Sequence, residues 1–540
     1  MGAPDGSRID DGLALHDRRA AALRAVLQVA GEAPPLRLDT HVSTVLITPG
    51  LAFKLKRPVR LPFVDLTDLA ARRRLCIEEV RLNRRLAPSL YLGVVSIVGP
   101  VERPALGEAW AVDDGAPEPR WPPGAELAVR MRAFAQAGLW SNRVPAGEVS
   151  QDEARALGAT IGAFHRDRAA RRPGSPFGTA AAFRARSLAN FDALLASLDG
   201  SGRERLARLR RDAERRHARL AALRDARDRD GFVRDGHGDL HLGNVTTVDG
   251  VAVPFDCLEF DEALRIGDVA DEVAFATMDL RHAGRPDLGA ALLDGWLHET
   301  GDFDAVALLD EGEAYRAAVR AKVAALDAAR DAACGGAARR DAYLHTAEST
   351  GTRAVPVLVA MHGLSGSGKS RVSAVLAAGI DAVRLRSDVE RKRERGLGPL
   401  SRAGMHGAMY APGARDAVYA RLAALARGLL GCGRSVVVDA SFLDRDRREA
   451  FAALAAEAGT GFVVVDVRAP EAVLRERLAA RAAAGADASD ADLAVLDAQL
   501  RAYRAPGEDE GARTLRWDAT AEPSREAIEA AWRAHRGRRT

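Results

Sequence analysis

The stretch Gly363-Leu-Ser-Gly-Ser-Gly-Lys-Ser370 decides how the second half of this chain folds. It matches the phosphate-binding loop pattern G-x-x-x-x-G-K-[ST] at every position. Glycines let backbone N–H groups close around phosphates, and a lysine ammonium reaches between the β- and γ-phosphates. The pattern therefore predicts a nucleoside triphosphate site built from Gly363, Leu364, Ser365, Gly366, Ser367, Gly368, Lys369 and Ser370.

The residues on either side of this loop fit the motif as well. Residues 355–361 have the pattern of a buried strand, and residues 371–378 continue as an Ala-rich helix. A strand, a glycine-rich loop and a helix N-terminus form the setting in which this motif binds phosphate. We expect a parallel-sheet α/β domain of the P-loop type here.

Two later strands are predicted to end in carboxylates. Residues 382–388 read as a strand ending at Asp388, which is placed to orient or deprotonate an acceptor hydroxyl. Its D-x-x-R spacing to Arg391 resembles polynucleotide kinases and zeta-toxin-like kinases. Residues 434–439 read as a strand ending at Asp439, which is suited to hold the water shell of Mg²⁺ together with Ser370.

A further strand, at 462–467, precedes a helix that carries Arg477 and Arg481 four residues apart, on one face. This arrangement looks like the arginine-bearing lid of gluconate and nucleotide kinases. Such arginines meet the charge that builds on a transferring phosphoryl group. A solvated charged face is the alternative for these two residues. Residues 485–490 are expected to form the tip of the lid.

The first half contains a second phosphate motif. His237-Gly-Asp-Leu-His-Leu-Gly-Asn244 has the form H-x-D-x-x-x-x-N, and Asp256 follows twelve residues after Asn244. In the kinase scheme the first Asp accepts the proton of the attacking hydroxyl, and the Asn and later Asp hold Mg²⁺. This scheme gives Asp239 the role of base and gives Asn244 and Asp256 the role of metal ligands.

By this residue order the region resembles the aminoglycoside phosphotransferase family and its choline and sugar kinase relatives, which have a bilobal protein-kinase-like fold. The resemblance implies that Lys54 pairs with nucleotide phosphates and that Glu79, on the next helix, is its ion-pair partner. Lys56 is the alternative to Lys54, because both lie on one face of the same predicted strand.

The resemblance also implies a buried Asp that braces the catalytic loop, at Asp268 or Asp271. One departure is that Asp256 is followed by Cys-Leu-Glu-Phe-Asp instead of glycine, so Glu259 or Asp261 could share the metal role. A reading of the loop histidines as metal ligands is weaker, since the segment lacks a nearby cysteine or third histidine.

The whole order, a kinase-like half followed by a P-loop half, resembles a bacterial family of fused proteins. Its members are described as bifunctional aminoglycoside phosphotransferase-like and ATP-binding proteins. We therefore expect an N-terminal segment (1–31), a kinase-like domain (32–346), a linker (347–353) and a P-loop kinase domain (354–540). The kinase-like domain would have an N-lobe at about 32–125 and a C-lobe at about 126–346.

Composition limits the partners. The net charge is +3, which gives no global case for nucleic acid or membrane binding. Four scattered cysteines without a C-x-x-C pair indicate a reducing compartment, and no apolar run reaches the length of a membrane span. The N-terminal residues lack the pattern of a signal peptide. We expect a cytoplasmic protein.

These observations predict an ATP- and Mg²⁺-dependent phosphotransferase with two nucleotide sites that acts on a hydroxyl of a small molecule. Two other classes stay open. One is a regulatory ATPase whose first half binds a ligand without catalysis. The other is a nucleic-acid end kinase, which the D-x-x-R spacing favours and the near-neutral charge opposes.

Overall fold

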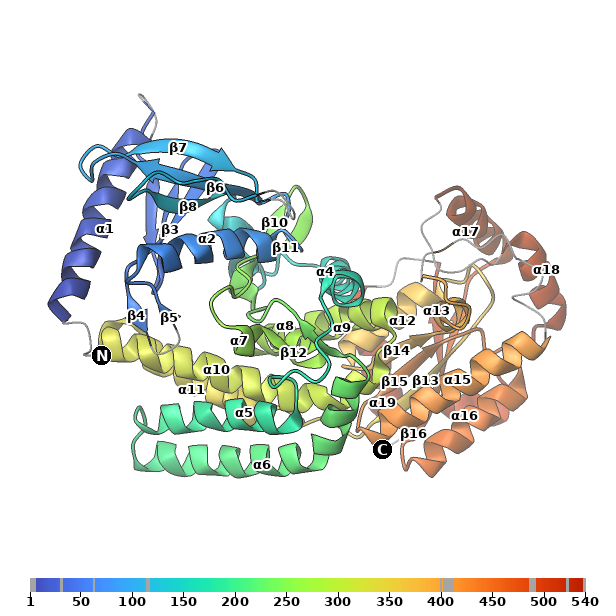
Figure 1. The fold of residues 1–540 in the computed structure, drawn as a ribbon. Coiled ribbons are helices and arrows are strands. Elements are labelled where there is room, and N and C mark those ends of the chain that lie inside the picture. The colour runs from blue at the N-terminus through green and yellow to red at the C-terminus, as the bar shows by residue number, and fades with distance from the viewer. Residues whose placement is uncertain are drawn as a thin grey trace. The chain divides into compact units, whose positions relative to one another are not determined.

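The computed structural model describes residues 6–29, 33–61, 64–112, 117–398, 401, 412–484, 492–520 and 524–537. The chain forms two compact units that are assembled from interleaved segments (Figure 1). Unit one comprises Met1–Glu148, Asp167–Phe183 and Ala221–Glu272. Unit two comprises Val149–Arg166, Arg184–Leu220 and Val273–Thr540.

Unit one is built around a six-stranded antiparallel sheet with the order β1-β2-β3-β8-β6-β7. Its strands are β1 (Leu36–Asp39), β2 (Ser43–Ile47), β3 (Leu51–Lys56), β6 (Tyr91–Val98), β7 (Ala105–Trp110) and β8 (Glu126–Arg132). Strands β4 (Arg60–Leu61) and β5 (Val64–Asp65) form a separate small pair. Both faces of the large sheet are covered, because alternate residues of β3 enter two different apolar clusters.

Helices α1 (Gly6–Val26) and α2 (Leu69–Asn83) lie on opposite faces of this sheet. Leu23 of α1 packs with Phe53 in one cluster, and Val80 of α2 packs with Ala52 in the other. Asp68 caps the start of α2 by accepting a hydrogen bond from the Ala71 N–H. Lys54 and Lys56 share the face of Ala52, so both are directed toward α2.

One boundary differs from the sequence expectations. The expected N-lobe ends at about 125, but β8 pairs with β3 and β6 and so belongs to the same sheet. The sequence of β8 alternates like any strand of a sheet, so its pattern does not indicate which lobe the strand belongs to. The domain limits as a whole stay a prediction.

The rest of unit one supplies the loops of the first candidate site. A hairpin is formed by β10 (Val245–Val248) and β11 (Val251–Pro254), and β9 (Val233–Asp235) pairs with β12 (Ile266–Asp268). The short helices here are η1 (Gln136–Gly138), α3 (Trp140–Arg143), η3 (Leu242–Asn244) and α7 (Glu262–Arg265).

Unit two contains a helical part and a parallel sheet. The helices of the first part are α4 (Gln151–Ala163), α9 (Pro286–Thr300), η4 (Phe303–Leu308), α10 (Leu309–Arg330), η5 (Ala332–Cys334) and α11 (Gly336–Ser349). The helices with residues in both units are η2 (Phe164–Arg168), α5 (Ala180–Leu195), α6 (Gly200–Arg229) and α8 (Val269–His282). Helix α4 crosses α9 at glycines, since a Cβ on Gly158 would lie 1.9 Å from the Leu292 carbonyl oxygen.

The sheet of unit two has five parallel strands in the order β14-β15-β13-β16-β17. Its strands are β13 (Val357–His362), β14 (Val383–Arg386), β15 (Val436–Asp439), β16 (Gly461–Arg468) and β17 (Thr514–Asp518). The helices around it are α12 (Lys369–Gly379), α13 (Ser387–Arg393), α15 (Pro412–Gly431), α16 (Arg445–Glu457), α17 (Glu471–Ala484), α18 (Leu493–Ala502), η6 (Glu508–Arg513) and α19 (Arg525–Gly537).

This sheet has the P-loop arrangement that the sequence predicts. Strand β13 is central, and α12 and α19 contribute Val372 and Trp532 to the apolar cluster with Val359 of that strand. Helices α15 and α16 lie side by side, as Figure 1 shows. Because all five strands are parallel, their carboxyl ends form one edge, where the phosphate loop and Asp439 meet.

Candidate active sites

The first candidate site lies in unit one and begins with the predicted ion pair between Lys54 and Glu79. Lys54 Nζ lies 2.8 Å from Glu79 Oε1 and 2.6 Å from Asp256 Oδ1. The lysine projects from β3, the glutamate from α2, and Asp256 follows β11. The predicted phosphate-contacting lysine and one predicted metal ligand are therefore brought together from three separate segments.

Lys56, the alternative lysine, binds the other oxygen of the same glutamate. Its Nζ lies 2.6 Å from Glu79 Oε2 and also contacts Glu259 Oε1. The side chain of Lys56 is 1% exposed, whereas that of Lys54 is 11% exposed and touches Asp256. This geometry favours Lys54 as the nucleotide contact, and it engages Glu259 with Lys56 instead of leaving it open to a metal.

These contacts set the charges of the first site. Burial lowers the pKa of Lys54, but the carboxylates of Asp256 and Glu79 raise it more, so its pKa lies well above the ordinary value. Burial raises the pKa of Glu79, and the two lysines lower it to a net value below the ordinary range. Lys54 and Glu79 therefore both carry their charges at neutral pH.

The predicted catalytic loop brings Asp239 and Asn244 together. Asn244 Nδ2 donates to the Asp239 carbonyl oxygen at 2.9 Å and to Asp239 Oδ2 at 3.0 Å. The amide oxygen of Asn244 is then the atom that suits a metal ion. His241 Nδ1 accepts from the Gly243 N–H at 3.0 Å, so its Nε2 carries the proton and lies 3.4 Å from Asp239 Oδ2.

His237 stabilises the start of this loop through hydrogen bonds. Its Nε2 donates to the Phe255 carbonyl oxygen at 3.0 Å, and its Nδ1 accepts from the Asp239 N–H at 3.4 Å. Burial lowers the pKa of His237, which keeps the ring neutral. Both loop histidines thus make hydrogen bonds within the loop, and the geometry does not support the reading of them as metal ligands.

The residue that contacts the loop backbone is one that the sequence did not single out. Glu272 Oε1 accepts from the His237 N–H at 2.8 Å, and a Cβ on Gly236 would lie 1.7 Å from Glu272 Oε2. The two expected bracing residues contact arginines of α6 instead: Asp268 is paired with Arg227, and Asp271 with Arg224. A glycine before the loop histidine was the available signal for such a close approach.

Asp256 has an unusual backbone conformation for a residue other than glycine. Its φ is 63°, in the left-handed region, and its N–H donates to the Tyr91 hydroxyl at 3.1 Å. Aspartate is among the residues that tolerate this region, and such conformations concentrate at functional sites. The turn directs the carboxylate toward Lys54.

The second candidate site is the phosphate loop of unit two. Gly363, Gly366 and Gly368 have φ values of 144°, 80° and 89°, which favour glycine. A Cβ on Gly366 would lie 2.6 Å from the Leu474 carbonyl oxygen, so α17 approaches the loop closely. Helix α12 begins at Lys369, and its N-terminal N–H groups therefore follow directly on the loop.

Lys369 folds back over the loop. Its Nζ donates to the Leu364 carbonyl oxygen at 2.7 Å. Burial lowers the pKa of Lys369 to about 8, against the opposing effect of the carboxylates of Asp439 and Asp388. This lysine is therefore the opposite of Lys54, whose pKa is raised by direct carboxylate contacts.

A pocket of about 260 Å³ opens at the phosphate loop. Its lining includes ten residues predicted from the sequence, namely Ser365, Gly366, Gly368, Lys369, Ser370, Asp388, Arg391, Asp439, Arg477 and Arg481. Gly363, Leu364 and Ser367 belong to the loop itself. The motif, the two carboxylates and the helix α17 arginines thus converge on one cavity.

Hydrogen bonds to side chains and to the backbone fix the side chains around this pocket. Arg391 Nη1 lies 2.7 Å from Asp388 Oδ1, as the D-x-x-R spacing allows on α13. Arg477 Nη2 donates to the Ala519 carbonyl oxygen at 2.7 Å. Gln499 of α18, which no sequence motif singles out, accepts a hydrogen bond from the Ser365 N–H at 2.8 Å.

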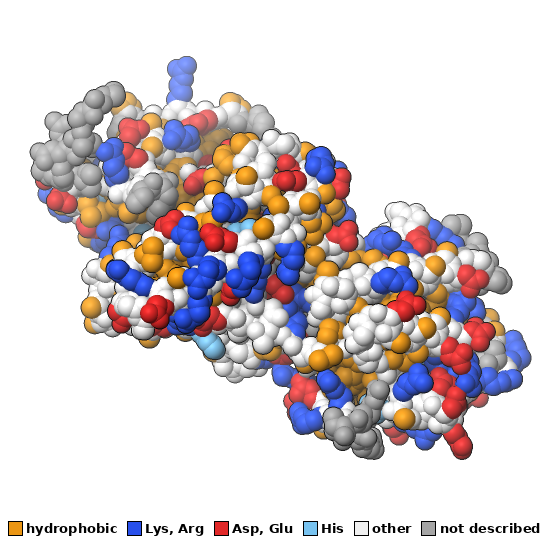
Figure 2. Space-filling view, turned by 90° about the horizontal axis from the view of Figure 1, so that it is seen from below, with side chains coloured by type: hydrophobic (Ala, Val, Ile, Leu, Met, Phe, Trp, Pro, Cys, Tyr) orange, Lys and Arg blue, Asp and Glu red, His pale blue; other side chains and the backbone are white. Residues whose placement is uncertain are grey.

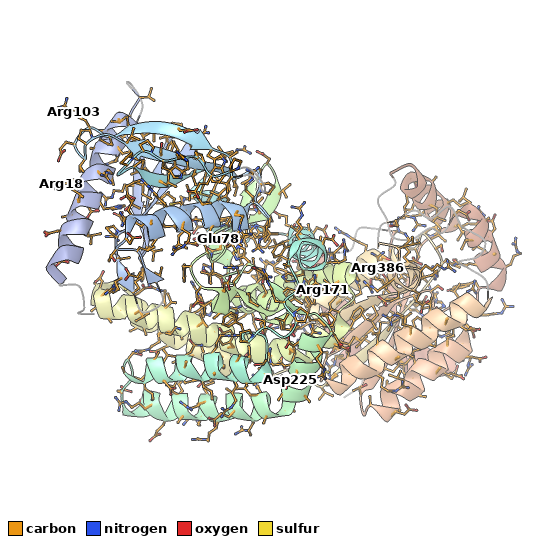
Figure 3. The ribbon with its side chains drawn as sticks, in the orientation of Figure 1. Arg18, Glu78, Arg103, Arg171, Asp225 and Arg386 are labelled. Carbon is orange, nitrogen blue, oxygen red and sulfur yellow. The ribbon has the colours of Figure 1, made fainter. Side chains whose placement is uncertain are left out.

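Asp439 ends β15 with an oxygen open to a ligand. Its Oδ2 is buried and makes no hydrogen bond within the described part of the chain. Arg386, labelled in Figure 3 at the end of β14, places Nε 3.4 Å from this atom, and Arg384 Nη1 lies 3.9 Å away. A buried carboxylate oxygen that lacks a hydrogen bond suits a hydrated cation.

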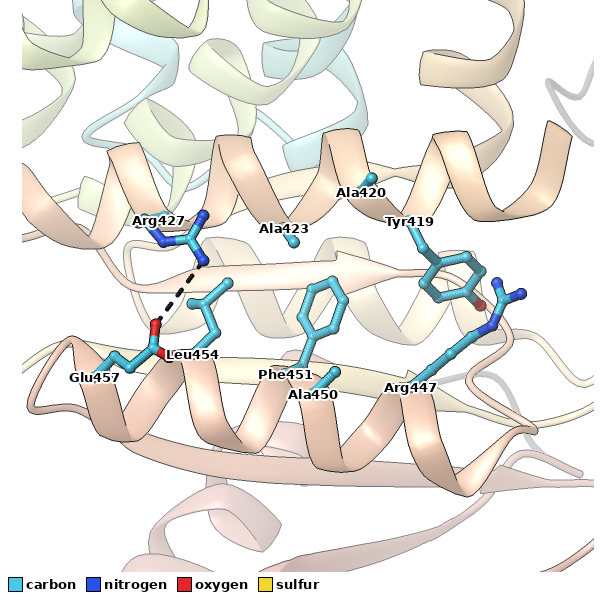
Figure 4. A pocket seen from close by; sticks show the side chains of 9 residues that line it. All are labelled: Tyr419, Ala420, Ala423, Arg427, Arg447, Ala450, Phe451, Leu454 and Glu457. Carbon is cyan, nitrogen blue, oxygen red and sulfur yellow. Dashed lines mark ion pairs between the residues drawn. The ribbon is translucent and has the colours of Figure 1, made fainter. Parts of the chain in front are cut away.

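Another hollow, of about 270 Å³, lies between α15 and α16 (Figure 4). Tyr419, Phe451 and Leu454 form its apolar part, and Arg427 lies 3.9 Å from Glu457 at one end. Its lining shares no residue with the phosphate-loop pocket, and it offers neither a phosphate loop nor a pair of carboxylates. We do not assign it to the chemistry.

Some expectations lie beyond these sites. The predicted lid tip, 485–490, falls outside the described residues. Among the described residues, no cluster of three or more His, Cys, Asp or Glu side chains could hold a metal ion. No described helix is long and apolar enough to span a bilayer.

The Arg-rich helix α6 can be interpreted as an amphipathic helix or as a basic surface for nucleic acid. Leu206, Leu209 and Leu220 are buried, and Arg210 and Arg205 pair with Asp192 and Glu348. Figure 2 shows basic and acidic side chains mixed on the face seen from below. The arrangement agrees with the amphipathic interpretation.

Comparisons with known proteins find a family model and several similar proteins. Residues 358–506 match a family model described as an AAA domain. Among solved structures, the chain resembles a choline/ethanolamine kinase family protein from Mesorhizobium loti, with 13% identity, a TM-score of 0.40, and coverage of 62% of this chain and 94% of that chain. It also resembles a gluconokinase from Sinorhizobium meliloti 1021, with 22% identity, a TM-score of 0.25, and coverage of 34% and 94%. The fold itself follows from the topology described above.

Relatives match over most of the chain. Uncharacterized protein Rv2004c of Mycobacterium tuberculosis is 30% identical over 467 residues, which cover 85% of this chain and 89% of that protein. Uncharacterized protein Mb2027c of Mycobacterium bovis matches to the same extent. The match extends well beyond the P-loop half and includes most of the kinase-like half. The chain therefore belongs to the family of these mycobacterial proteins.

Proposed function

We propose that this chain is an ATP- and Mg²⁺-dependent phosphotransferase with two nucleotide sites, each of which transfers a γ-phosphoryl group to a hydroxyl of a small molecule. The observation that carries the proposal is the pocket at the phosphate loop. There a phosphate-binding lysine, two carboxylates and two arginines from another helix face one cavity of about 260 Å³. A simple ATPase needs no carboxylate for an acceptor, whereas a kinase does.

In the second site each residue has a defined part. Asp388 orients the acceptor hydroxyl and takes up its proton as the bond from oxygen to the γ-phosphorus forms and the bond to the ADP oxygen breaks. Lys369 binds the phosphates, and Arg477 and Arg481 meet the charge that spreads over the transferring group. The ion pair with Arg391 fixes the orientation of Asp388.

In the first site the corresponding parts come from Asp239 and Lys54. Asp239 accepts the proton of the acceptor hydroxyl, and its carboxylate is held by the amide of Asn244. Lys54 contacts the nucleotide phosphates and is itself positioned by Glu79. The contact between Lys54 and Asp256 places the proposed phosphate-binding lysine next to the proposed metal ligand.

The donor sets suit Mg²⁺ in both sites. In the first site Asn244 and Asp256 would hold the ion, and in the second site Ser370 and Asp439 would do so. All four offer the hard oxygen ligands that Mg²⁺ prefers, and Asp439 Oδ2 is a buried oxygen without a hydrogen bond. When bound, the ion supplies charge neutralisation for the β- and γ-phosphates.

The place of action that we propose is the cytoplasm. All four cysteines are free, and two of them, Cys76 and Cys257, are buried. This agrees with the reducing compartment that the scattered cysteines predict. Nucleic acid is not the acceptor we propose, because the net charge is only +3 and basic side chains are interspersed with acidic ones on the face that Figure 2 shows.

The experiment measures ATP consumption and product phosphorylation by the full chain with pooled sugars, aminoglycosides and nucleotides. Three proteins are compared: the natural chain, Lys369→Ala and Asp239→Asn. The proposal expects acceptor-stimulated turnover in the natural chain. Lys369→Ala should lose the turnover of the second site, and Asp239→Asn should lose that of the first site. Turnover that no pool stimulates would identify a regulatory ATPase, and stimulation by nucleic-acid ends alone would identify an end kinase.

A further inference from the structure

A buried cluster of charges links helix α9 to the phosphate loop within unit two. Arg384, on β14, donates from Nε to Asp294 Oδ1 at 3.0 Å and from Nη2 to Asp294 Oδ2 at 2.7 Å. Its remaining nitrogen, Nη1, donates to the Ser370 carbonyl oxygen at 2.9 Å. The side chains of Arg384 and Asp294 are 3% and 6% exposed. One guanidinium therefore connects a carboxylate on α9 with the last residue of the phosphate loop.

The groups around Asp294 supply more positive than negative charge. Arg155 Nε lies 2.8 Å from Asp294 Oδ2, and His298 Nε2 lies 3.4 Å from Asp294 Oδ1. Burial lowers the pKa of His298 to about 3, so this ring is neutral. Burial raises the pKa of Asp294, but Arg384 and its other neighbours lower it further, so the carboxylate is ionised. It is the negative partner of two guanidinium groups.

The next carboxylate within reach of Arg384 is Asp439. Arg384 Nη1 lies 3.9 Å from Asp439 Oδ2, the oxygen without a hydrogen bond. A bidentate pair fixes a guanidinium in both position and plane, which keeps Arg384 at this longer distance. Without the Asp294 charge, Arg384 would be a buried cation whose nearest counter-charge is Asp439.

We propose that Asp294 is a positioning residue for the phosphate-loop site. By holding Arg384 in a bidentate pair, it keeps that guanidinium on the Ser370 carbonyl and leaves Asp439 available to a hydrated Mg²⁺. This inference rests on the proposed function of Ser370 and Asp439 as the Mg²⁺ residues of the second site. By this proposal, a residue of helix α9 positions a residue of the phosphate-loop site.

The proposal also predicts which part of the chain forms a complete second site. Asp294 lies in α9, outside the P-loop domain expected at 354–540. That segment alone would retain Arg384 and lose its carboxylate partner. The full chain is therefore the form in which the second site is measured.

The test uses the full chain with Lys54→Met, which removes the lysine of the first site and leaves the second site to be observed. The half-saturating Mg²⁺ concentration for binding of a non-hydrolysable ATP analogue is measured with and without Asp294→Asn. We expect Asp294→Asn to raise this concentration about tenfold, because an uncompensated cation beside Asp439 repels Mg²⁺. Binding of the analogue in excess chelator, without Mg²⁺, should not weaken.

A matched control variant and a rescue variant distinguish a specific effect of Asp294 on Arg384 from a general loss of structure in unit two. Asp310→Asn removes a comparable ion pair of unit two, since Asp310 Oδ1 lies 2.8 Å from Arg434 Nη2. This control should leave the Mg²⁺ requirement unchanged. In the double variant Asp294→Asn with Arg384→Gln the excess charge is gone, and the requirement should return to within about twofold of the starting value.

Each result decides the matter. The proposal is wrong if Asp294→Asn has the starting Mg²⁺ requirement, if Asp310→Asn shifts it equally, or if Arg384→Gln fails to rescue. Should Asp294→Asn not fold, Arg384→Gln alone decides, because removing the cation near Asp439 must not raise the requirement. If Lys369→Ala still binds the analogue in the Lys54→Met chain, the proposed function of the phosphate loop fails instead.

Discussion

The two lysines predicted to contact phosphate, Lys54 in unit one and Lys369 in unit two, have opposite electrostatic surroundings. Lys54 touches the carboxylates of Glu79 and Asp256 at 2.8 and 2.6 Å, and its pKa is raised well above the ordinary value. Lys369 donates to a backbone carbonyl, and burial lowers its pKa to about 8. In the first site, carboxylates balance the charge of the lysine. In the second site, the lysine has no direct carboxylate contact among the described residues, and we propose that nucleotide phosphate balances its charge.

Under the proposed function, the two sites would bind a triphosphate in two different ways. In unit one the lysine is held by side chains from separate segments, so its position depends on tertiary packing. In unit two the loop backbone and the N-terminus of α12 provide the cradle, and the lysine needs no carboxylate to orient it. The first arrangement buries the lysine against carboxylates, and the second buries it against a backbone carbonyl oxygen.

The largest expected effect comes from the arginines of α17, for which unit one has no predicted counterpart. Arg481→Ala or Arg477→Ala should lower the rate of phosphoryl transfer at the second site by about 10³-fold, with little change in ATP affinity. The measurement is acceptor-stimulated turnover of the full chain with Lys54→Met. Equal turnover in the variant and its parent would remove these arginines from the chemistry and leave the solvated-face interpretation.

The next largest effect concerns stability. Glu79→Gln should destabilise the fold by about 3 kcal/mol, because two buried lysines lose their shared counter-charge. Lys369→Ala should cost far less, since its ammonium pairs with a carbonyl and not with a buried carboxylate. Thermal or denaturant unfolding of the two variants checks the contrast. Similar losses of stability would contradict the idea that only the first site is internally balanced.

A smaller effect separates the two acids of the first site. Asp239→Asn should reduce transfer at that site by about 10²-fold and leave Mg²⁺-ATP affinity nearly intact, because a base contacts the acceptor. Asp256→Asn should weaken Mg²⁺-ATP binding itself. Nucleotide titrations and turnover are measured in the full chain with Lys369→Ala. An equal loss of nucleotide affinity in both variants would overturn this division of roles.

The smallest effect is a pH dependence that only the second site should show. Below about pH 8 Lys369 is an ammonium in the free protein, so nucleotide affinity should be constant there. Above about pH 8 the free lysine is neutral and binding must take up a proton, so affinity should fall about tenfold per pH unit. The inflection should vanish in Lys369→Arg. The first site should lack it, because the pKa of Lys54 is raised.

The sequence predicted those features that short motifs encode. The phosphate loop and the carboxylates of Asp388 and Asp439 were accessible from spacing along the chain. The pairing of Lys54 with Glu79 was implied by the resemblance to the aminoglycoside phosphotransferase family. The fold class and the family were confirmed. The roles of the individual site residues stay predictions, supported by the geometry in which they converge.

The features that were missed depend on contacts between distant segments. Glu272 at the catalytic loop and Asp294 beside Arg384 are carboxylates among 75 acidic residues, which face 78 basic ones, so composition cannot identify the pairs. The placement of β8 in the first sheet depends on pairing with β3, which is also non-local. Long-range pairing is set by packing, and a single sequence carries little signal for it.

The central claim is that one chain holds two nucleotide sites, and counting bound nucleotides tests it most directly. The stoichiometry of a non-hydrolysable ATP analogue with Mg²⁺ is measured by calorimetry on the full chain, Lys369→Ala, Lys54→Met and the double variant. The account predicts two sites in the natural chain, one in each single variant and none in the double variant. A single site in the natural chain, or undiminished binding in the double variant, would contradict it.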